Sequence, residues 1–243
     1  AGARLNDAQL RGADLAGADL QRASLRDASL EGAHLRGALL GGAELCDASL
    51  QGADLRAASL AGANLRDARL EGADLAEADL QGVNRADASL EGVDLHKASL
   101  AGVNLNDANL QGANLSEASA PEARLREASL QGANLAGADL SRADLREANL
   151  QGADLHNSTL TEAQLTQANL QGASLKNASL VRANLREANL QGARLAEADL
   201  REACLAEANL RDADLRDAVL EGADLSGART GGRRGPHGRG HWS

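Results

Sequence analysis

The chain has 243 residues and a formal net charge of −10, with 25 Lys and Arg against 35 Asp and Glu. It contains no Phe, Tyr or Met, so an aromatic core is excluded. The acidic balance disfavours a nucleic-acid-binding function, and no apolar run is long enough to cross a membrane as a helix. No signal peptide is visible, and we expect a cytoplasmic protein.

The N-terminal residues already belong to the repeat that fills most of the chain. The chain does not begin with Met, and Ala3 and Leu5 stand in register with everything that follows. This start favours a fragment of a longer protein, with a cap or a fused domain upstream. Because an open solenoid end exposes unpaired strand edges, we expect a cap, a partner or a homodimer contact at one or both ends.

Residues 1–228 follow a period of five. Of the 45 positions that are multiples of five from Leu5 to Leu225, 43 are Leu, and Ala stands two positions before nearly all of them. An α-helix would spread these Leu around its surface, and a flat strand would place successive Leu on opposite faces. Four corners per coil remove both conflicts, because every Ala and Leu then faces inward. We predict one all-β solenoid over residues 1–228, with about 11 coils stacked ~4.8 Å apart.

A second period of 20 residues supports the square coil. The column that begins at Gly12 and recurs every 20 residues is Gly in ten of eleven cases. Glycine there permits the positive φ of a type II turn. The column that begins at Asp7 is acidic in ten of twelve cases, and we expect it to use a different turn with negative φ.

The repeat resembles the A(D/N)LXX signature of the pentapeptide repeat family, as in Ala13-Asp14-Leu15-Ala16-Gly17. The resemblance covers residues 1–228 and implies a right-handed quadrilateral parallel β-helix. It also implies that binding to DNA gyrase or topoisomerase IV as a DNA mimic, with protection from quinolones, is an admissible function. The chain departs from many similar proteins because it has no Phe in the core, no inserted loop and no apolar C-terminal dimerisation segment.

Two positions interrupt the Leu column. Arg85 stands where a Leu should point inward, and a buried unpaired charge is costly, so we expect a bulge that lets Arg85 reach solvent. Ala120 underfills the core, at a local cost of ~2–3 kcal/mol, and is a candidate position for a kink. Pro121 after it is favourable in a turn.

The C-terminal segment 229–243 breaks the repeat. It carries Arg229, Arg233, Arg234 and Arg239 without any acidic residue, and its Gly-rich composition predicts a flexible basic tail. The two cysteines, Cys46 and Cys204, lie about eight coils apart in the predicted rod, too far for a disulfide.

Two rows of acidic residues are the candidate partner-binding surfaces. With one carboxylate every ~4.8 Å, the first row approaches the ~3.4 Å spacing of phosphates along one DNA strand. We expect Arg26, Arg66, Arg126, Arg146 and Arg186, which each precede an acid of this row, to neutralise part of it. The first row comprises Asp7, Asp27, Asp47, Asp67, Asp87, Asp107, Glu127, Glu147, Glu187 and Glu207. The second row, on a neighbouring face, comprises Asp14, Asp54, Asp74, Asp94, Asp154 and Asp214.

These features leave two functions open. One is a rigid acidic rod that mimics DNA and binds a type II topoisomerase such as DNA gyrase. The other is a general interaction or scaffold module, whose polar residues simply fill solvent-facing turns. Enzyme activity is disfavoured because a core of Leu and Ala offers no cavity, and we expect no metal, cofactor or small-molecule substrate. Of the repeat region's histidines, His34, His96 and His156, the last two fall on the same face but three coils apart, too far to share a metal.

Overall fold

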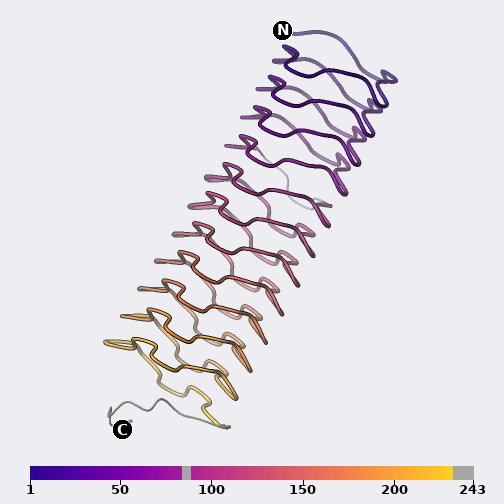
Figure 1. Ribbon diagram of the computed structural model, residues 1–243. Helices are drawn as coiled ribbons and strands as arrows, with labels where there is room; N and C mark the ends of the chain where they lie inside the picture. The colour runs from indigo at the N-terminus through magenta and orange to yellow at the C-terminus, as the bar shows by residue number, and fades with distance from the viewer. Residues whose placement is uncertain (84–88, 232–243) are drawn as a thin grey trace.

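The chain winds into a rod of stacked four-sided coils (Figure 1). The computed structural model describes residues 1–83 and 89–231. Within these residues there is no helix and no strand longer than one residue, because each side of a coil contributes a single isolated bridge residue. Every bridge is parallel and joins residues 20 apart, from Arg4 with Ser24 to Asn209 with Arg229. The predicted right-handed quadrilateral β-helix is confirmed.

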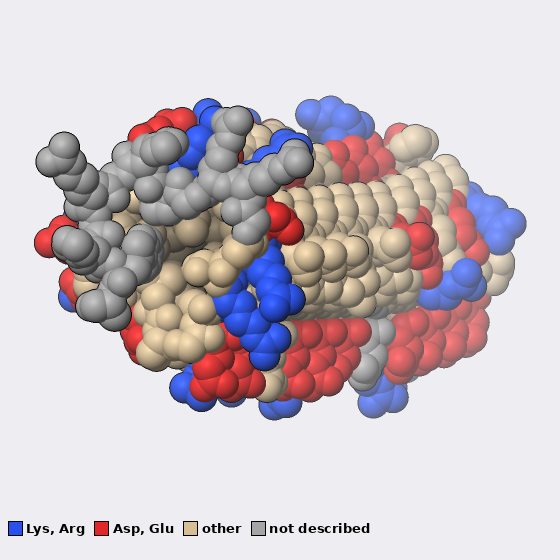
Figure 2. Space-filling view, turned by 90° about the horizontal axis from the view of Figure 1, so that it is seen from below, with Lys and Arg blue, Asp and Glu red and all other residues tan. Residues whose placement is uncertain are grey.

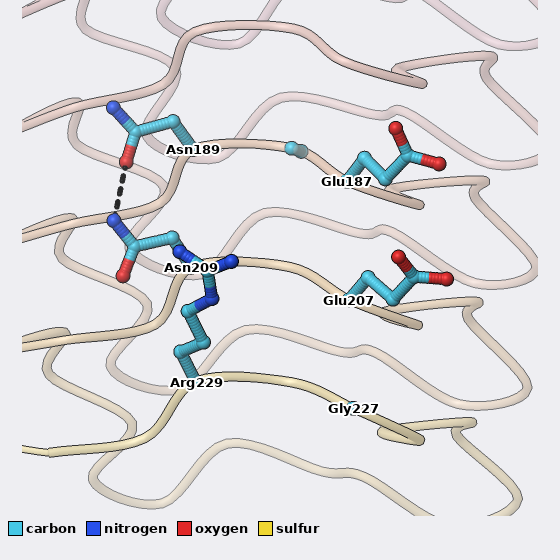
Figure 3. A pocket seen from close by; sticks show the side chains of 7 residues that line it. Glu187, Asn189, Glu207, Asn209, Gly227 and Arg229 are labelled. Atoms are coloured by element: carbon cyan, nitrogen blue, oxygen red, sulfur yellow. Dashed lines mark hydrogen bonds between the residues drawn. The ribbon is translucent and has the colours of Figure 1, made fainter.

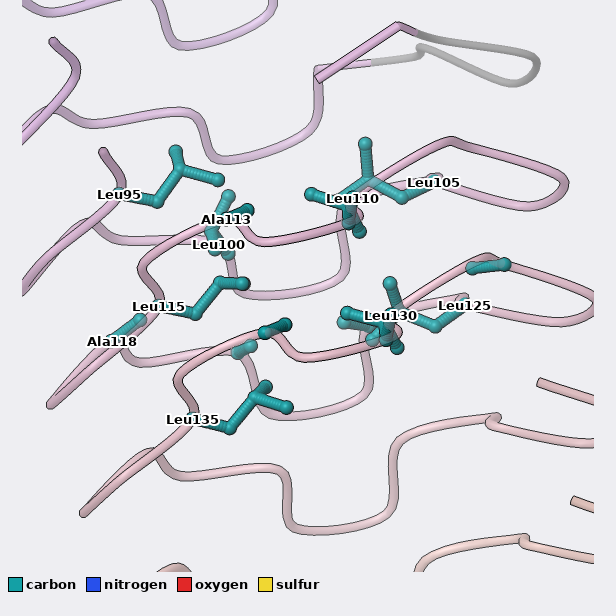
Figure 4. Close-up of a cluster of buried hydrophobic side chains, with 14 of the residues drawn as sticks. Leu95, Leu100, Leu105, Leu110, Ala113, Leu115, Ala118, Leu125, Leu130 and Leu135 are labelled. Carbon is teal, nitrogen blue, oxygen red and sulfur yellow. The ribbon is translucent and has the colours of Figure 1, made fainter. Parts of the chain in front are cut away.

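Leu and Ala side chains fill the interior of the rod (Figure 4). Within each repeat they lie two residues apart and share the inner face, while the residue between them points outward. In the middle coils these side chains are almost fully buried, as in Leu130 and Leu145 at 0% exposure. In the end coils the packing is looser, and Leu5 and Leu225 are only partly buried.

Three backbone hydrogen bonds in each repeat hold the coils together. Leu5 N–H donates to the carbonyl of Ser24 on the next coil at 2.7 Å, and Ser24 N–H donates back to Ala3 at 2.8 Å. The N–H two residues after each inward Leu also donates to the next coil, as Asp7 N–H does to the Arg26 carbonyl at 2.9 Å. Each corner is closed by a further bond, as from Ala8 N–H to the Leu5 carbonyl. This pairing makes the rod a rigid support for whatever its corners carry.

The acidic column uses the same turn as the Gly column. Asp7 has φ of 56° and Glu207 has φ of 61°, close to the 63° of Gly12. The expectation of a negative φ at these positions is therefore wrong. The left-handed conformation lets one N–H reach the next coil while the following N–H closes the corner. The left-handed conformation costs a non-glycine residue ~1–2 kcal/mol, and the hydrogen bonds offset this cost.

The irregular positions disturb the described coils little. Ala120 is buried, and its N–H donates to Asp139 at 2.8 Å as a Leu would, so the ladder continues without a break. Arg85, with its expected bulge, lies outside the described residues. Ser158 replaces an inward Ala, and its hydroxyl donates to the Leu155 carbonyl at 2.6 Å. Both Cys46 and Cys204 are free thiols, as predicted.

Candidate interaction surfaces

The first acidic row runs along one corner of the rod. Figure 2 shows it as an almost continuous band of carboxylates beside a broad uncharged face. Asp87 lies outside the described residues, Gln167 interrupts the band and Gly227 ends it. We call the described members, all of which are exposed, the acidic row: Asp7, Asp27, Asp47, Asp67, Asp107, Glu127, Glu147, Glu187 and Glu207.

Arginines neutralise mainly the C-terminal half of the acidic row. Arg126 contacts Glu127 at 3.1 Å and Glu147 on the next coil at 2.9 Å. Arg186 likewise joins Glu187, at 3.1 Å, to Glu207. In the N-terminal half, Arg66 pairs with Asp67 at 3.1 Å. The predicted neutralisation is confirmed for these three arginines.

The prediction is wrong for the other two arginines, which turn away from the row. Arg26 pairs with Glu44 at 3.3 Å. Arg146 forms a two-pronged contact with Asp144, with Nε at 2.7 Å from Oδ1 and Nη2 at 2.6 Å from Oδ2. These hydrogen bonds hold the pKa of the Asp144 carboxyl below its usual value, against the effect of partial burial.

The same fork forms at every Asp-Leu-Arg tripeptide of the described chain. The other pairs are Asp54 with Arg56, Asp199 with Arg201 and Asp214 with Arg216, each with an Nη2–Oδ2 distance of 2.6 Å. Asp and Arg flank an inward Leu, so both side chains leave the same outer face and meet there. The tripeptide is a sequence signal that turns its arginine toward the aspartate, and it was not recognised from the spacing of the charges alone.

The N-terminal half of the acidic row keeps most of its charge. Among the described residues, no ion pair involves Asp7, Asp27, Asp47 or Asp107. Their carboxylates are exposed and follow one another along the same corner. Among the described residues, the carboxylates of the row without an ion pair therefore lie mainly in this half.

The second acidic row serves the turns of the coil. Its carboxylates accept the N–H two residues ahead, as Asp14 does from Ala16 at 3.2 Å and Asp94 from His96 at 2.9 Å. Arg56 neutralises Asp54 and also approaches Asp74 at 3.5 Å. All members except Asp14 are at least partly buried: Asp54, Asp74, Asp94, Asp154 and Asp214. The predicted second binding row is therefore largely engaged within the coil.

The two rows do not form one surface. In each coil, one complete side and the corner that follows it separate the acidic row from the second row. From residue 109 to residue 209 this intervening side carries only uncharged polar residues and Gly outward: Asn109, Gln111, Ser129, Gln131, Asn149, Gln151, Asn169, Gln171, Asn189, Gln191 and Asn209. Their arrangement corrects the expectation that the second row occupies a face adjoining the first.

Stacked asparagines run along this uncharged side. Asn169 Nδ2 donates to Asn149 Oδ1 at 3.2 Å, and Asn189 and Asn209 repeat the contact on the next coils at 3.2 and 3.0 Å. We call these four residues the amide ladder. Each oxygen also accepts the N–H two residues ahead, as from Gln191 to Asn189 at 3.2 Å. The recurrence of Asn every 20 residues was its sequence signal.

A groove opens where the acidic row and the amide ladder reach the C-terminal coils (Figure 3). Its volume is about 410 Å³. Glu187 and Glu207 form one wall, Asn189 and Asn209 the other, and Arg229 stands at its end. We call it the C-terminal groove. A second, interior cavity of about 10 Å³ is lined by Leu and Val around residues 65–105, and it is too small and apolar for a substrate.

The sequence profile described as pentapeptide repeats matches most of the chain. The matched segments are residues 3–42, 23–60, 48–84, 88–120, 123–161, 163–201 and 193–229. The chain belongs to the pentapeptide repeat family.

Solved pentapeptide repeat proteins are similar to parts of this chain that range from 38% to 86% of its length. HetL of the cyanobacterium Nostoc, which is involved in the regulation of heterocyst differentiation, is 39% identical over 86% of this chain and 88% of its own, with a TM-score of 0.38. A protein of the Arabidopsis thaliana thylakoid lumen is 35% identical over 38% of this chain and 65% of its own, with a TM-score of 0.38. QnrB1, a plasmid-mediated fluoroquinolone resistance protein, is 20% identical over 70% of this chain and 84% of its own, with a TM-score of 0.36. No curated protein sequence matches the chain.

The histidines of this pentapeptide repeat protein hold local contacts. His96 Nδ1 lies 2.9 Å from the Ser116 carbonyl and hydroxyl oxygens, and His156 Nδ1 lies 2.8 Å from Asp154 Oδ1. The described residues contain no cluster of three or more metal-ligating side chains. They also contain no helix that is long and apolar enough to span a bilayer.

Proposed function

We propose that this pentapeptide repeat protein is a non-enzymatic binding protein whose acidic row occupies the DNA-binding groove of a type II topoisomerase, in the first place DNA gyrase. The observation that carries the proposal is the exposed N-terminal half of the row, where Asp7, Asp27 and Asp47 form no ion pair with any residue that the structure describes. Carboxylates that follow one another along one corner of the rod have the charge sign and the linear order of a phosphate backbone. They therefore match the basic groove in which a topoisomerase binds DNA.

Rigidity supports the same proposal. The row stands on a backbone whose inter-coil hydrogen bonds measure 2.7–2.9 Å around Asp7, so little conformational freedom is lost on binding. The charge density stays below that of duplex DNA, with its one charge per ~1.7 Å. We therefore expect affinity that competes with DNA at moderate salt and falls steeply as the salt concentration rises. The membership of a fluoroquinolone resistance protein in the same family makes quinolone protection the first activity to test.

A supercoiling assay with purified gyrase and a quinolone tests this function. Addition of the protein at micromolar concentration should restore supercoiling, and the restoration should fade with added salt. Asp27→Asn with Asp47→Asn should weaken it. If gyrase stays inhibited at every concentration of the wild-type protein, the topoisomerase proposal fails.

The uncharged side of the rod supports a second candidate, a general interaction module. The amide ladder presents a flat, ordered and neutral surface on which DNA mimicry does not depend. Asn169→Lys with Asn189→Lys would disrupt this surface and leave the acidic row intact. Loss of an identified partner in this variant, with quinolone protection retained, would favour the module. We also propose that an end of the rod, where Leu5 or Leu225 is only partly buried, supports a homodimer contact, which sedimentation analysis would detect.

A further inference from the structure

Five arginines stand directly before members of the acidic row, at the first position of the same corner: Arg26, Arg66, Arg126, Arg146 and Arg186. Three of them pair with the row and two turn away from it. The difference between the two groups lies on the side of the coil that leads into this corner. We call it the preceding side, and its outward residues recur every 20 residues from Ser24 to Asp224.

The two arginines that leave the row have a carboxylate within reach on the preceding side. Arg146 binds Asp144 of its own coil, with Nη2 at 2.6 Å from Oδ2. Arg26 binds Glu44 of the next coil, with Nη2 at 3.3 Å from Oε2. Apart from these two acids, the column of outward residues on this side contains only Asp224 as an acid. A carboxylate on the preceding side therefore accompanies each arginine that turns away.

The three arginines that remain on the row lack an available acid on the preceding side. Arg66 and Arg186 each follow an asparagine of that side, and Arg126 follows an arginine. On the coil after Arg126 the preceding side carries Asp144, but the fork with Arg146 already engages this carboxylate. The preceding side, and not the row, thus decides where each arginine places its charge.

Glu44 has the contacts needed to hold its arginine. Its Oε2 atom accepts a hydrogen bond from Asn64 Nδ2 at 3.1 Å as well as the one from Arg26. The Glu44 side chain is 41% exposed, against 60% for Asp67 of the acidic row, so water screens an ion pair with Glu44 less. Glu44 is therefore a better partner for Arg26 than an exposed aspartate of the row.

We propose that Glu44 is a positioning residue that keeps Arg26 off the acidic row, so that Asp27 stays open to a basic partner. Arg66 shows the alternative, because without an acid on the preceding side its Nε lies 3.1 Å from Asp67 Oδ2. Arg26 and Asp27 occupy the same two corner positions, so a released Arg26 makes the same contact. The consequence for binding rests on the proposed function, whereas the placement of Arg26 does not.

Glu44→Gln tests the proposal in two ways. A crystal structure of this variant should show the Arg26 guanidinium within ~4 Å of the Asp27 carboxylate, a contact absent from the wild type. The protein concentration needed for half-maximal gyrase protection should rise by about threefold or more. Glu77→Gln is the matched control, because it removes the same charge from an exposed residue on the opposite corner of the rod. It should change that concentration by less than about twofold.

Glu44→Gln with Arg26→Gln separates positioning from simple loss of charge. This double variant has the net charge of the wild type and no guanidinium to release, so it should protect gyrase as well as the wild type. Circular dichroism should show every variant folded. The proposal is overturned if Arg26 stays away from Asp27 in the Glu44→Gln structure, or if the double variant protects no better than Glu44→Gln. Because the crystal structure involves no topoisomerase, a wild-type protein that fails to protect gyrase contradicts only the proposed function.

Discussion

Two corners of this rod use the same turn and opposite charge patterns. In the acidic row, carboxylates follow one another along the coils. On another corner, Arg142 lies between Glu122 and Glu162, at 3.2 and 3.3 Å. Arg182 lies between Glu162 and Glu202, at 3.9 and 2.7 Å. We call these five residues the ion-pair ladder.

The comparison separates what the fold requires from what it only tolerates. Glu122 and Arg142 have φ of 58° and 56°, the same left-handed conformation as Asp27 at 56°. The turn therefore accepts a side chain of either charge. Where Glu and Arg alternate along a corner, neighbouring side chains form ion pairs with each other. The fold does not require like charges at this position, so the run of aspartates in the acidic row needs another explanation, which the proposed binding to a partner would supply.

The largest expected effect comes from the core between the two corners. Leu145→Ala should lower the free energy of unfolding by ~2–5 kcal/mol, because it leaves a cavity in a closely packed coil. Glu147→Gln on the same coil should change it by less than about 1 kcal/mol. Urea unfolding followed by circular dichroism measures both. An equal loss in the free energy of unfolding for the two variants would mean that the core contributes no more to stability than the corner charges.

The next prediction compares the two halves of the acidic row. Asp27→Asn with Asp47→Asn should raise the protein concentration needed for half-maximal gyrase protection by about tenfold. Glu147→Gln with Glu207→Gln removes the same charge from sites that arginines already neutralise, and should raise it by less than about threefold. If the second variant proved the weaker protector, the N-terminal half would not be the binding surface.

A smaller effect follows from converting the ion-pair ladder into a like-charge row. Arg142→Glu removes two ion pairs and places three carboxylates on consecutive coils, so the thermal midpoint should fall by a few degrees. Arg22→Glu occupies the same turn position, with Gly2 and Gly42 on either side, and should leave the midpoint nearly unchanged. An unchanged midpoint in Arg142→Glu would show that the ladder adds no stability.

The smallest effect concerns the Asp-Leu-Arg forks and appears only in acid. Because contact with Arg146 lowers the pKa of Asp144, the fork stabilises the folded state above the unfolded pKa of about 3.9. Its contribution disappears as the pH falls through the lower folded value. The stability difference between wild type and Asp144→Asn should therefore shrink as the pH falls below about 4. A difference that stays constant over this range would contradict the assigned role.

The sequence sufficed for the fold because one periodicity constrains every residue. Leu at every fifth position admits few backbones, and the Gly12 column reveals the four-sided coil. The turn at Asp7 was mispredicted because residue preference suggested a negative φ, whereas the hydrogen bond to Arg26 on the next coil sets its conformation. Local preference was overruled by a contact 19 residues away in the chain.

The surfaces could be predicted only in part. The columns of charge are visible in the sequence, but the partner of each arginine depends on which outer face its side chain leaves. Arg146 turned back to Asp144 and Arg26 reached Glu44, although both directly precede an acid of the row. The C-terminal groove needs Gly227 and Arg229 to meet on one coil beside Glu207, a coincidence that linear spacing does not display.

Competition with duplex DNA for purified gyrase tests the central claim most directly. We predict that the wild-type protein displaces a fluorescently labelled duplex, with a steep loss of potency as salt rises, and that Asp27→Asn with Asp47→Asn displaces it far less well. Failure of the wild-type protein to displace the duplex at low salt, or equal displacement by the variant, would contradict the account.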